Sequence, residues 1–272
     1  MLTCFCGTHA LGRRFLLTAA AAALSCPALA QSPPASAGAP DPALLEDLVA
    51  ANRILADQGV VDGFGHISVR HDKDPNRFLL SRSMAPALVT AADIMEFDLD
   101  GTPVDAQGRS PYLERFIHGE ILRARPDVQS VVHNHSPGVI PFGVAGAALR
   151  PVYHLSGFLG GGVPVFEIRD AAGPATDMLV RNPGLGRALA ATLGQRPVAL
   201  MRGHGAVVVG TGIRQAVFRA VYTEVNARLQ AEAQRLGPVV FLNDEEAAKA
   251  AATNDGLVGR PWELWRRKAM GG

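Results

Sequence analysis

Short apolar segments alternate with helical segments along this chain, and several connections between them have the composition of tight turns. HISVR alternates apolar and polar residues, HDKDPNR has turn composition and RFLLS is apolar, so residues 66–81 are predicted to form a β-hairpin. MEFDLDG at 95–101 is predicted to form another short strand that runs into an Asp-Gly turn. Helical periodicity at 41–59, 111–126 and 213–236 separates the strands. The pattern indicates a sheet covered by helices and at least partly antiparallel.

The first thirty residues have the features of an export signal. Residues 12–17, GRRFLL, contain two adjacent arginines followed by an apolar stretch that ends at Leu29, and Ala28 and Ala30 supply the small residues of a cleavage site. The apolar stretch is shorter than the ~20 residues that a membrane-spanning helix needs. We therefore predict that residues 1–30 form a twin-arginine signal peptide, and that the cleaved protein is periplasmic and not attached to the membrane.

Residues 31–42 are predicted to form a flexible linker, because QSPPASAGAPDP is rich in proline, alanine and serine and lacks apolar periodicity. The folded domain is expected at 43–272, a length that suits one domain. The whole chain has a net charge of +1 with both signs interspersed. Neither nucleic acid nor an anionic membrane surface is therefore an expected partner.

The cysteines of the chain, Cys4, Cys6 and Cys26, all precede the predicted cleavage site. No disulfide is then available to the mature protein, and any metal ion must be held by histidine and carboxylate. Export in the folded state, as expected of the twin-arginine route, would allow the ion to be loaded beforehand.

Two histidines lie at the end of an apolar strand. His133 and His135 are two residues apart in VVHNH, and side chains at this spacing share a face of an extended strand, so they can bind one ion. A third ligand is available in His204, which lies between two glycines where the chain can turn sharply. Glu114, on the helix that leads into the histidine strand, is placed to supply a carboxylate. Alternatively, because an isolated His-x-His is a weak signal, these histidines could fill a core and a turn.

In this combination the chain resembles the class II aldolase/adducin family over about residues 44–235. The family pattern is a glutamate on a helix, a His-x-His that closes the next strand 19 residues later, and a distant histidine in a glycine-flanked turn. Here these residues are Glu114, His133, His135 and His204. GHISVR at 65–70 is also similar to the family's Gly-Asn-x-Ser-x-Arg segment.

The resemblance implies that His133, His135 and His204 bind one divalent metal ion per chain, Zn²⁺ or Mn²⁺, and that Glu114 is the catalytic acid/base. It also implies an α/β fold of three layers, α/β/α, with a central, largely antiparallel sheet. The expected assembly is a homo-oligomer, commonly a tetramer, with the metal near a subunit boundary. The C-terminal region with its two tryptophans would then be a candidate to complete a neighbour's site.

The segments that hold phosphate in the sugar-phosphate aldolases of this family differ here. Their Gly-Asn, Thr-Gly and Ser-Ser pairs correspond to Gly65-His66, Ser83-Met84 and Tyr112-Leu113, and two of the three pairs have lost their small polar character. A phosphorylated sugar is therefore disfavoured as substrate. FLLSRSMAP and PYLERFIHGEI instead resemble the branch that contains metal-dependent decarboxylases of hydroxylated aromatic dicarboxylates.

Several further side chains are candidates for substrate contacts. Arg82 offers a bidentate guanidinium that suits a carboxylate, or it is a solvated turn residue. His118, four residues after Glu114 on the same predicted helix, could tune that carboxylate or bind substrate, and Tyr153 could line the pocket, although packing is an equal alternative for both. Additional hydrogen-bond donors are Ser81, Ser83 and His66. We therefore expect a small, carboxylate-bearing substrate.

The implied function is a metal-dependent carbon–carbon lyase that acts on a hydroxy-carbonyl or hydroxyaryl carboxylate substrate by aldol cleavage or decarboxylation. Both reactions leave an electron pair on carbon, which a divalent metal stabilises as an enolate or phenolate while a carboxylic acid returns a proton. Exclusion of water is expected to raise the pKa of Glu114 for this role. The alternatives are a metal-free, adducin-like binding module and an iron-dependent oxygenase on the same fold.

Overall fold

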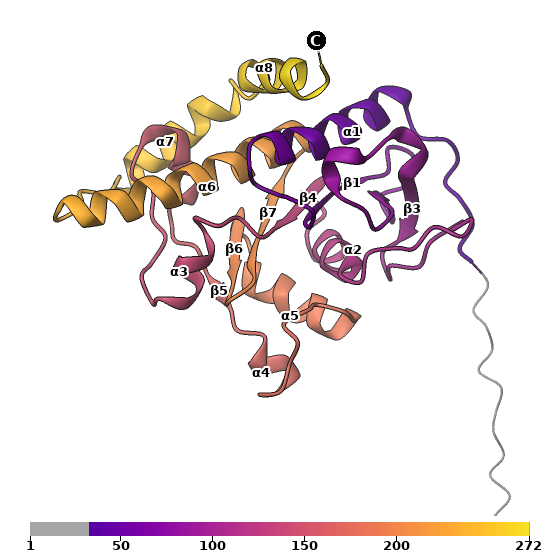
Figure 1. Cartoon of the computed structure of the whole chain (residues 1–272), viewed down its shortest axis with the longest axis horizontal. Helices are drawn as coiled ribbons and strands as arrows, with labels where there is room; N and C mark the ends of the chain where they lie inside the picture. Colours follow the sequence, from indigo (N-terminus) through magenta and orange to yellow (C-terminus); the bar gives the residue numbers. More distant parts are fainter. Residues whose placement is uncertain (1–32, 272) are drawn as a thin grey trace, which may run out of the picture. The chain divides into compact units, whose positions relative to one another are not determined.

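Seven strands form one sheet, in the order β3-β2-β1-β4-β7-β6-β5 (Figure 1). The structure is a computed structural model that describes residues 33–271, so the signal peptide predicted at 1–30 lies outside the described residues. The strands are β1 His66–Arg70, β2 Arg77–Ser81, β3 Ile94–Asp98, β4 Ser130–Asn134, β5 Val165–Phe166, β6 Val198–Met201 and β7 Gly205–Gly210. Neighbours pair antiparallel except β5 and β6, which are parallel. The predictions of a hairpin at 66–81 and of a largely antiparallel sheet are confirmed.

Helices cover both faces of this sheet. Those described are α1 Pro42–Asp57, α2 Arg115–Ala124, α3 Ile140–Val144, α4 Arg169–Ala172, α5 Pro183–Leu193, α6 Ile213–Leu236, α7 Asp244–Asp255 and α8 Gly259–Ala269, with 3₁₀ helices η1 Pro86–Leu88, η2 Ala91–Asp93 and η3 His154–Leu159. One face carries α1 and α6, and the other carries α2 and α5 (Figure 1). The three-layer α/β/α arrangement is thus confirmed. None of the described helices is long and apolar enough to cross a membrane.

Alternation along the central strands divides their apolar side chains between two cores. Val132 and Val208 pack with α1 and α6, whereas Val131 and Val207 pack with α2 and α5. All residues of β4 and β7 are buried. Covering on both faces explains why β7, GAVVVG, has no alternation of apolar and polar residues.

The helix predicted at 111–126 is shorter in the structure. α2 begins at Arg115, and Glu114 occupies its N-cap position instead of lying on the helix. The hydroxyl of Tyr112 donates to the carbonyl of Met84 at 2.5 Å, and this long-range contact fixes the residues before Glu114 outside the helix. The carboxylate of Glu114 is therefore directed by the start of α2 and not by a helical face.

Part of the linker predicted at 31–42 contacts the domain. Residues 33–41 contain neither helix nor strand. The hydroxyl of Ser36 and the backbone N–H of Ala37 both donate to the carboxylate of Glu96 in β3, at 2.6 and 2.8 Å. This part of the segment is thus held against the edge of the sheet.

The aromatic C-terminal segment is helical and belongs to the core of its own chain. Trp262 and Trp265 in α8 are only 1% and 8% exposed, and they pack with α1 and α6. The ring of Tyr222 lies 5.9 Å from that of Trp265. The two tryptophans therefore pack within their own chain, and completion of a neighbour's site by this region stays a prediction.

Candidate metal centre

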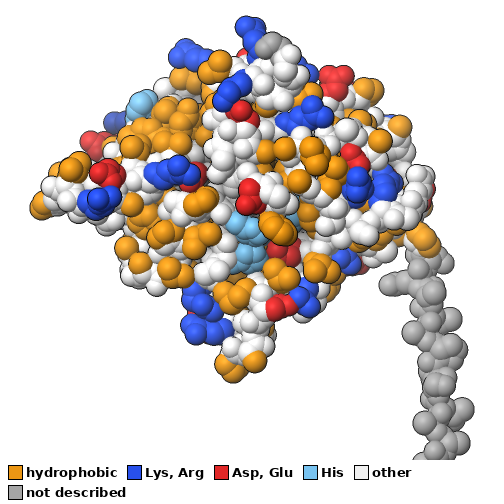
Figure 2. All heavy atoms as spheres, in the orientation of Figure 1, with side chains coloured by type: hydrophobic (Ala, Val, Ile, Leu, Met, Phe, Trp, Pro, Cys, Tyr) orange, Lys and Arg blue, Asp and Glu red, His pale blue; other side chains and the backbone are white. Residues whose placement is uncertain are grey.

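Three histidines and a glutamate meet at one end of the central strands. β4 ends just before His135, β7 begins just after His204, and antiparallel pairing of Asn134 with Ala206 brings these two ends together. The four predicted residues Glu114, His133, His135 and His204 each offer a ligand atom, and these atoms all lie within 4.8 Å of one another. Histidine side chains are visible in the middle of the face shown in Figure 2, beside acidic and hydrophobic ones. The structure thus assembles the cluster that the sequence predicts.

The turn that carries His204 depends on its glycines. Gly203 has a φ of +62°, in the left-handed region that favours glycine. A Cβ on Gly205 would lie 1.9 Å from the carbonyl oxygen of Asn134, so no larger residue fits between β7 and β4. This close approach of two backbones places the imidazole of His204 against that of His135.

The nitrogen atoms of the cluster face one another. His135 Nε2 lies 3.1 Å from His133 Nε2 and 2.9 Å from His204 Nε2. His133 Nδ1 is 3.2 Å from the carbonyl oxygen of Ala206, a pure acceptor, so Nδ1 carries the proton and Nε2 presents a lone pair. Burial, together with the neighbouring His133 and His204, lowers the pKa of His135 to about 4, which keeps its ring neutral near pH 7. Imidazole rings that converge through Nε2 are suited to share one cation.

Glu114 completes the cluster from the N-cap of α2. One carboxylate oxygen accepts the backbone N–H of Val180 at 2.9 Å, and the other lies 3.4 Å from His133 Nε2 and 3.5 Å from His204 Nε2. Burial acts to raise the pKa of Glu114, but the two histidines outweigh it and hold the pKa well below its usual range. The expectation that exclusion of water raises this pKa is therefore wrong for this arrangement, because the histidine partners favour the carboxylate.

The donor set fits a divalent cation. Three neutral nitrogens and one carboxylate match the ligands that zinc and manganese take in proteins. His204 Nδ1 is buried and has no hydrogen-bond partner among the described residues, whereas its Nε2 faces the other ligands. His135 Nε2 lies within hydrogen-bonding distance of the other two Nε2 atoms, an arrangement that is expected where a cation or a proton is shared.

A second group of polar side chains lies beside the cluster. His66 pairs with His133 across β1 and β4, and the two rings are 5.1 Å apart. His118 hydrogen-bonds to His66 and to Ser68 instead of to Glu114, beside which its position on the predicted helix had placed it. Sequence reasoning missed Ser68, although its spacing of two from His66 in GHISVR puts both on one face of β1.

Burial keeps the inner histidines of this group neutral. Burial and the neighbouring His133 lower the pKa of His118 to about 3. Burial and the adjacent His118 also lower the pKa of His66 well below its usual value. Sequence reasoning also missed Tyr112 as part of the group: its ring centre lies 4.3 Å from that of His66.

The substrate contacts predicted at the end of β2 and just after it, Ser81, Arg82 and Ser83, have other partners. Arg82 Nε is 2.6 Å from the carboxylate of Asp93, which also caps η2, so the guanidinium is already paired. The hydroxyl of Ser81 lies 3.5 Å from that of Tyr112. Ser83 contacts the carbonyl of Ser110 through its backbone N–H. In this structure none of the three has a hydrogen bond to a residue of the histidine cluster.

Tyr153 lies away from the cluster. Its ring is near Tyr222 of α6, with centres 6.4 Å apart, and its hydroxyl is buried with no hydrogen-bond partner among the described residues. Burial, followed by the proximity of Tyr222, raises the pKa of this phenol. Within this chain the structure does not bring Tyr153 to the four ligands.

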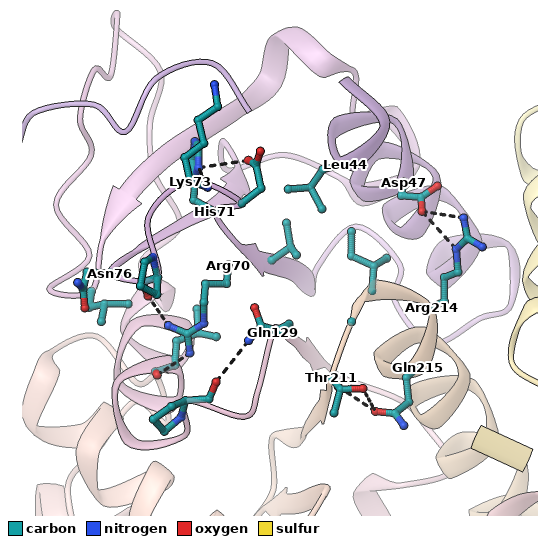
Figure 3. Close-up of a pocket in the computed structure, with 18 of the residues that line it drawn as sticks. Leu44, Asp47, Arg70, His71, Lys73, Asn76, Gln129, Thr211, Arg214 and Gln215 are labelled. Carbon is teal, nitrogen blue, oxygen red and sulfur yellow. Dashed lines mark hydrogen bonds and ion pairs between the residues drawn. The ribbon is translucent and has the colours of Figure 1, made fainter. Parts of the chain in front are cut away.

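A cavity of about 870 Å³ lies at the opposite end of the same strands (Figure 3). The residues that line the cavity include Arg70, at the end of β1, and the first residues of α6. The histidine cluster lies at the other end of the sheet, where β1 begins and β4 ends. The charged groups of the cavity are already paired: Arg214 with the carboxylate of Asp47, and Arg70 with backbone carbonyls that include that of Leu122. We therefore place the reactive centre at the histidine cluster.

The fold has three layers, α/β/α, and three imidazoles and a carboxylate gather at one end of its sheet. This combination is typical of metalloenzymes. A model of the class II aldolase and adducin N-terminal domain matches residues 46–231. The chain belongs to the class II aldolase/adducin family, as its sequence pattern predicts.

Relatives in this family are named as decarboxylases and aldolases. The chain is 38% identical over 242 residues to decarboxylase tropJ of Talaromyces stipitatus, covering 80% of this chain and 91% of the relative. It is 37% identical over 201 residues to 3,4-dihydroxyphthalate decarboxylase of Terrabacter sp., covering 69% and 80%. The solved structure of L-fuculose 1-phosphate aldolase from Glaciozyma antarctica superposes with a TM-score of 0.70 at 26% identity, covering 84% of this chain and 90% of that one. Decarboxylases and aldolases are lyases, and this chain is accordingly an enzyme of lyase type.

Proposed function

We propose that this protein is a carboxy-lyase that removes CO₂ from a hydroxyaryl carboxylate with the help of one divalent cation, Zn²⁺ or Mn²⁺. The observation that carries the proposal is the convergence of His133, His135 and His204 through Nε2 beside the carboxylate of Glu114. The two most similar relatives described above are decarboxylases, which favours decarboxylation over aldol cleavage.

The three histidines would hold the cation, and Glu114 would approach it when no substrate is bound. When bound, the cation supplies Lewis-acid stabilisation of the negative charge that forms on the substrate oxygen when the carbon–carbon bond breaks. The surroundings disfavour a phosphate group, because bulky Met84 and Tyr112 replace small donors and Tyr112 is engaged with the Met84 backbone. A planar aromatic acid is the better match.

Glu114 is the residue placed to move the proton. The carboxylate oxygen that faces His133 and His204 is placed to accept the proton of the substrate hydroxyl. The bond between the ring carbon and CO₂ then breaks, the electron pair remains with the ring, and Glu114 returns its proton to that carbon. Val180 N–H holds one carboxylate oxygen throughout, which leaves the other free for this exchange.

Metal analysis and product analysis test the proposal. Purified wild type should contain about one zinc or manganese per chain and should release CO₂ from hydroxyphthalates under nitrogen. His133→Ala and His204→Ala should lose the metal, whereas His154→Ala, an exposed histidine of η3, should retain it. Folded wild-type protein that takes up no metal even after reconstitution would leave an adducin-like binding module. Iron with substrate-dependent oxygen uptake would establish an oxygenase instead.

We also propose that the mature protein acts in the periplasm as a homo-oligomer. The twin-arginine pattern at 12–17 supports export, and the exposed side chains of Phe64, Leu113 and Val144, at 69%, 60% and 57%, support burial against another copy. Replacement of Arg13 and Arg14 by lysine should retain the protein in the cytoplasm. Light scattering of the purified protein should give a mass of several chains, and a monomer would contradict the assembly.

A further inference from the structure

A chain of three buried polar side chains leads toward the candidate metal centre. Ser68 Oγ lies 2.6 Å from His118 Nδ1, and His118 Nε2 lies 2.7 Å from His66 Nδ1. Ser68 and His118 are fully buried, and His66 is only 3% exposed. Burying three polar groups between the sheet and α2 costs solvation energy that apolar side chains would not cost. Such an arrangement indicates a role beyond packing.

The chain of hydrogen bonds has a direction. Among the described residues, the hydroxyl oxygen of Ser68 has His118 Nδ1 as its one side-chain or backbone partner, so the hydroxyl proton is satisfied only if Ser68 donates. His118 Nδ1 then accepts, and the single proton of the neutral His118 ring lies on Nε2. His118 Nε2 in turn donates to His66 Nδ1, which leaves the proton of His66 on Nε2.

The free end of the chain is the Nε2 of His66. Tyr112 covers one side of the imidazole with ring centres 4.3 Å apart, and His133 lies on another side at 5.1 Å. Nε2 of His66 has no hydrogen-bond partner among the described residues. It is nevertheless not completely buried, so a ligand can reach it. An N–H group that is rigidly held and still accessible beside the cluster is a preformed hydrogen-bond donor.

We propose that Ser68 and His118 are positioning residues that hold His66 in its Nε2–H tautomer, and that this N–H binds an anionic oxygen of the substrate next to the metal-bound group. The proposal rests on the proposed function for the identity of the substrate as a hydroxyaryl carboxylate. It assigns to His66 the recognition of a carboxylate or phenolate oxygen. A phosphate-binding family member has an asparagine at this place in the segment, by the resemblance of GHISVR, and a fixed imidazole offers a single donor instead.

The tautomer can be measured without substrate. Long-range ¹H–¹⁵N correlation spectra of histidine-labelled protein, zinc-loaded or metal-free if none binds, should show Nε2–H for His66 and for His118. Ser68→Ala removes the directing hydroxyl and should shift His66 toward a mixture of tautomers. Ser130→Ala is the matched control. Ser130 is equally buried in the adjacent strand and donates to the backbone carbonyl of Ser68, so it takes no part in the Ser68–His118–His66 hydrogen bonds. An Nδ1–H tautomer of His66, or an unchanged spectrum in Ser68→Ala, would overturn the proposal.

Ligand affinity tests the donor role separately. With 2-hydroxybenzoate as probe, His66→Leu should bind about tenfold more weakly or worse, as expected for loss of a hydrogen bond to a charged group. His66→Gln, whose amide N–H₂ can replace the donor, should recover part of that loss, and equal affinities of the two variants would contradict a donor role. Wild type that binds no hydroxybenzoate would contradict the proposed function, whereas the tautomer spectra would still decide the positioning role.

Discussion

Glu114 and Val180 are 66 residues apart in the sequence and are joined by a hydrogen bond of 2.9 Å from the Val180 backbone N–H to the Glu114 carboxylate. The bond crosses from the loop before α5 to the N-cap of α2. It fixes one carboxylate oxygen and turns the other toward His133 and His204. The carboxylate proposed as the acid/base is thus positioned by a backbone N–H, and a side-chain substitution at Glu114 leaves that donor in place.

We expect Glu114→Gln to abolish most activity while it leaves the fold and the metal in place. Its amide oxygen can still accept the Val180 N–H, but the side chain can no longer take up and return a proton. The rate of CO₂ release should fall about 10²- to 10⁴-fold, the usual contribution of a positioned acid/base. Stopped-flow detection of CO₂ and metal analysis of the same sample measure both quantities. A variant with nearly wild-type turnover would remove Glu114 from the mechanism.

Metal binding should stabilise the protein by mass action, because the unfolded chain cannot assemble the four ligands. At a zinc or manganese concentration of 100 times Kd, the gain is about 2.7 kcal/mol, which corresponds to roughly 5–10 °C in Tm for a chain of this size. Thermal unfolding with and without chelator measures it. His135→Ala should show no difference between the two conditions, and His154→Ala should behave as wild type. An equal response of His135→Ala and wild type would place the ion elsewhere.

Part of the candidate metal centre can be predicted from local sequence patterns. The shared orientation of His133 and His135 follows from the two-residue period of a strand, and the glycines around His204 mark a close approach of two backbones. The sheet and its covering helices likewise follow from apolar periodicity. The meeting of His204 and Glu114 with this pair is not local, and the resemblance to the family pattern predicts it.

What the sequence does not reveal are contacts between distant segments. The helix predicted at 111–126 starts later, at α2, because Tyr112 is anchored to Met84, 28 residues earlier. Helical spacing leaves His118 open between a role beside Glu114, substrate binding and packing, and its hydrogen-bond partners lie on β1. The sequence likewise leaves Arg82 open between a carboxylate ligand and a solvated turn residue, and its partner Asp93 belongs to a short 3₁₀ helix that the sequence pattern does not reveal.

Stability should depend on the ionisation of Asp93 at low pH. Hydrogen bonds from Thr90 and then from Arg82 lower the pKa of Asp93 from 3.8 to about 2. Because the pKa of Asp93 is lower in the folded state, its ionised carboxylate stabilises the fold. This stabilisation is fully present well above pH 3.8, the ordinary pKa, and is lost as the pH falls through about 2. We expect the ionised Asp93 to contribute about 1 kcal/mol to the free energy of unfolding. This is less than the pKa shift alone implies, because Arg82 is 41% exposed and water screens the ion pair.

Urea unfolding of wild type and Asp93→Asn over this pH range tests the assignment. The difference in free energy of unfolding should be largest near pH 7 and should have lost most of its size by pH 2, where Asp93 is half protonated in the folded state. Asp170→Asn, at an exposed position in α4, is the control and should be neutral at every pH. A difference that is as large at pH 2 as at pH 7 would attribute the effect of Asp93 to packing and not to its charge.

Gly205→Ala should both destabilise the sheet and weaken the metal centre. The new Cβ would lie 1.9 Å from the carbonyl oxygen of Asn134, and because the obstacle is backbone, β7 must move away from β4. The cost in free energy of unfolding should be about 3 kcal/mol or more. The control is Gly259→Ala at the start of α8, where a Cβ meets nothing within 4 Å and alanine should stabilise by about 0.4–1 kcal/mol. Since His204 precedes Gly205 directly, a folded Gly205→Ala protein should also bind metal more weakly than Gly259→Ala, and titration calorimetry that gives equal metal affinities would show that the turn does not position His204.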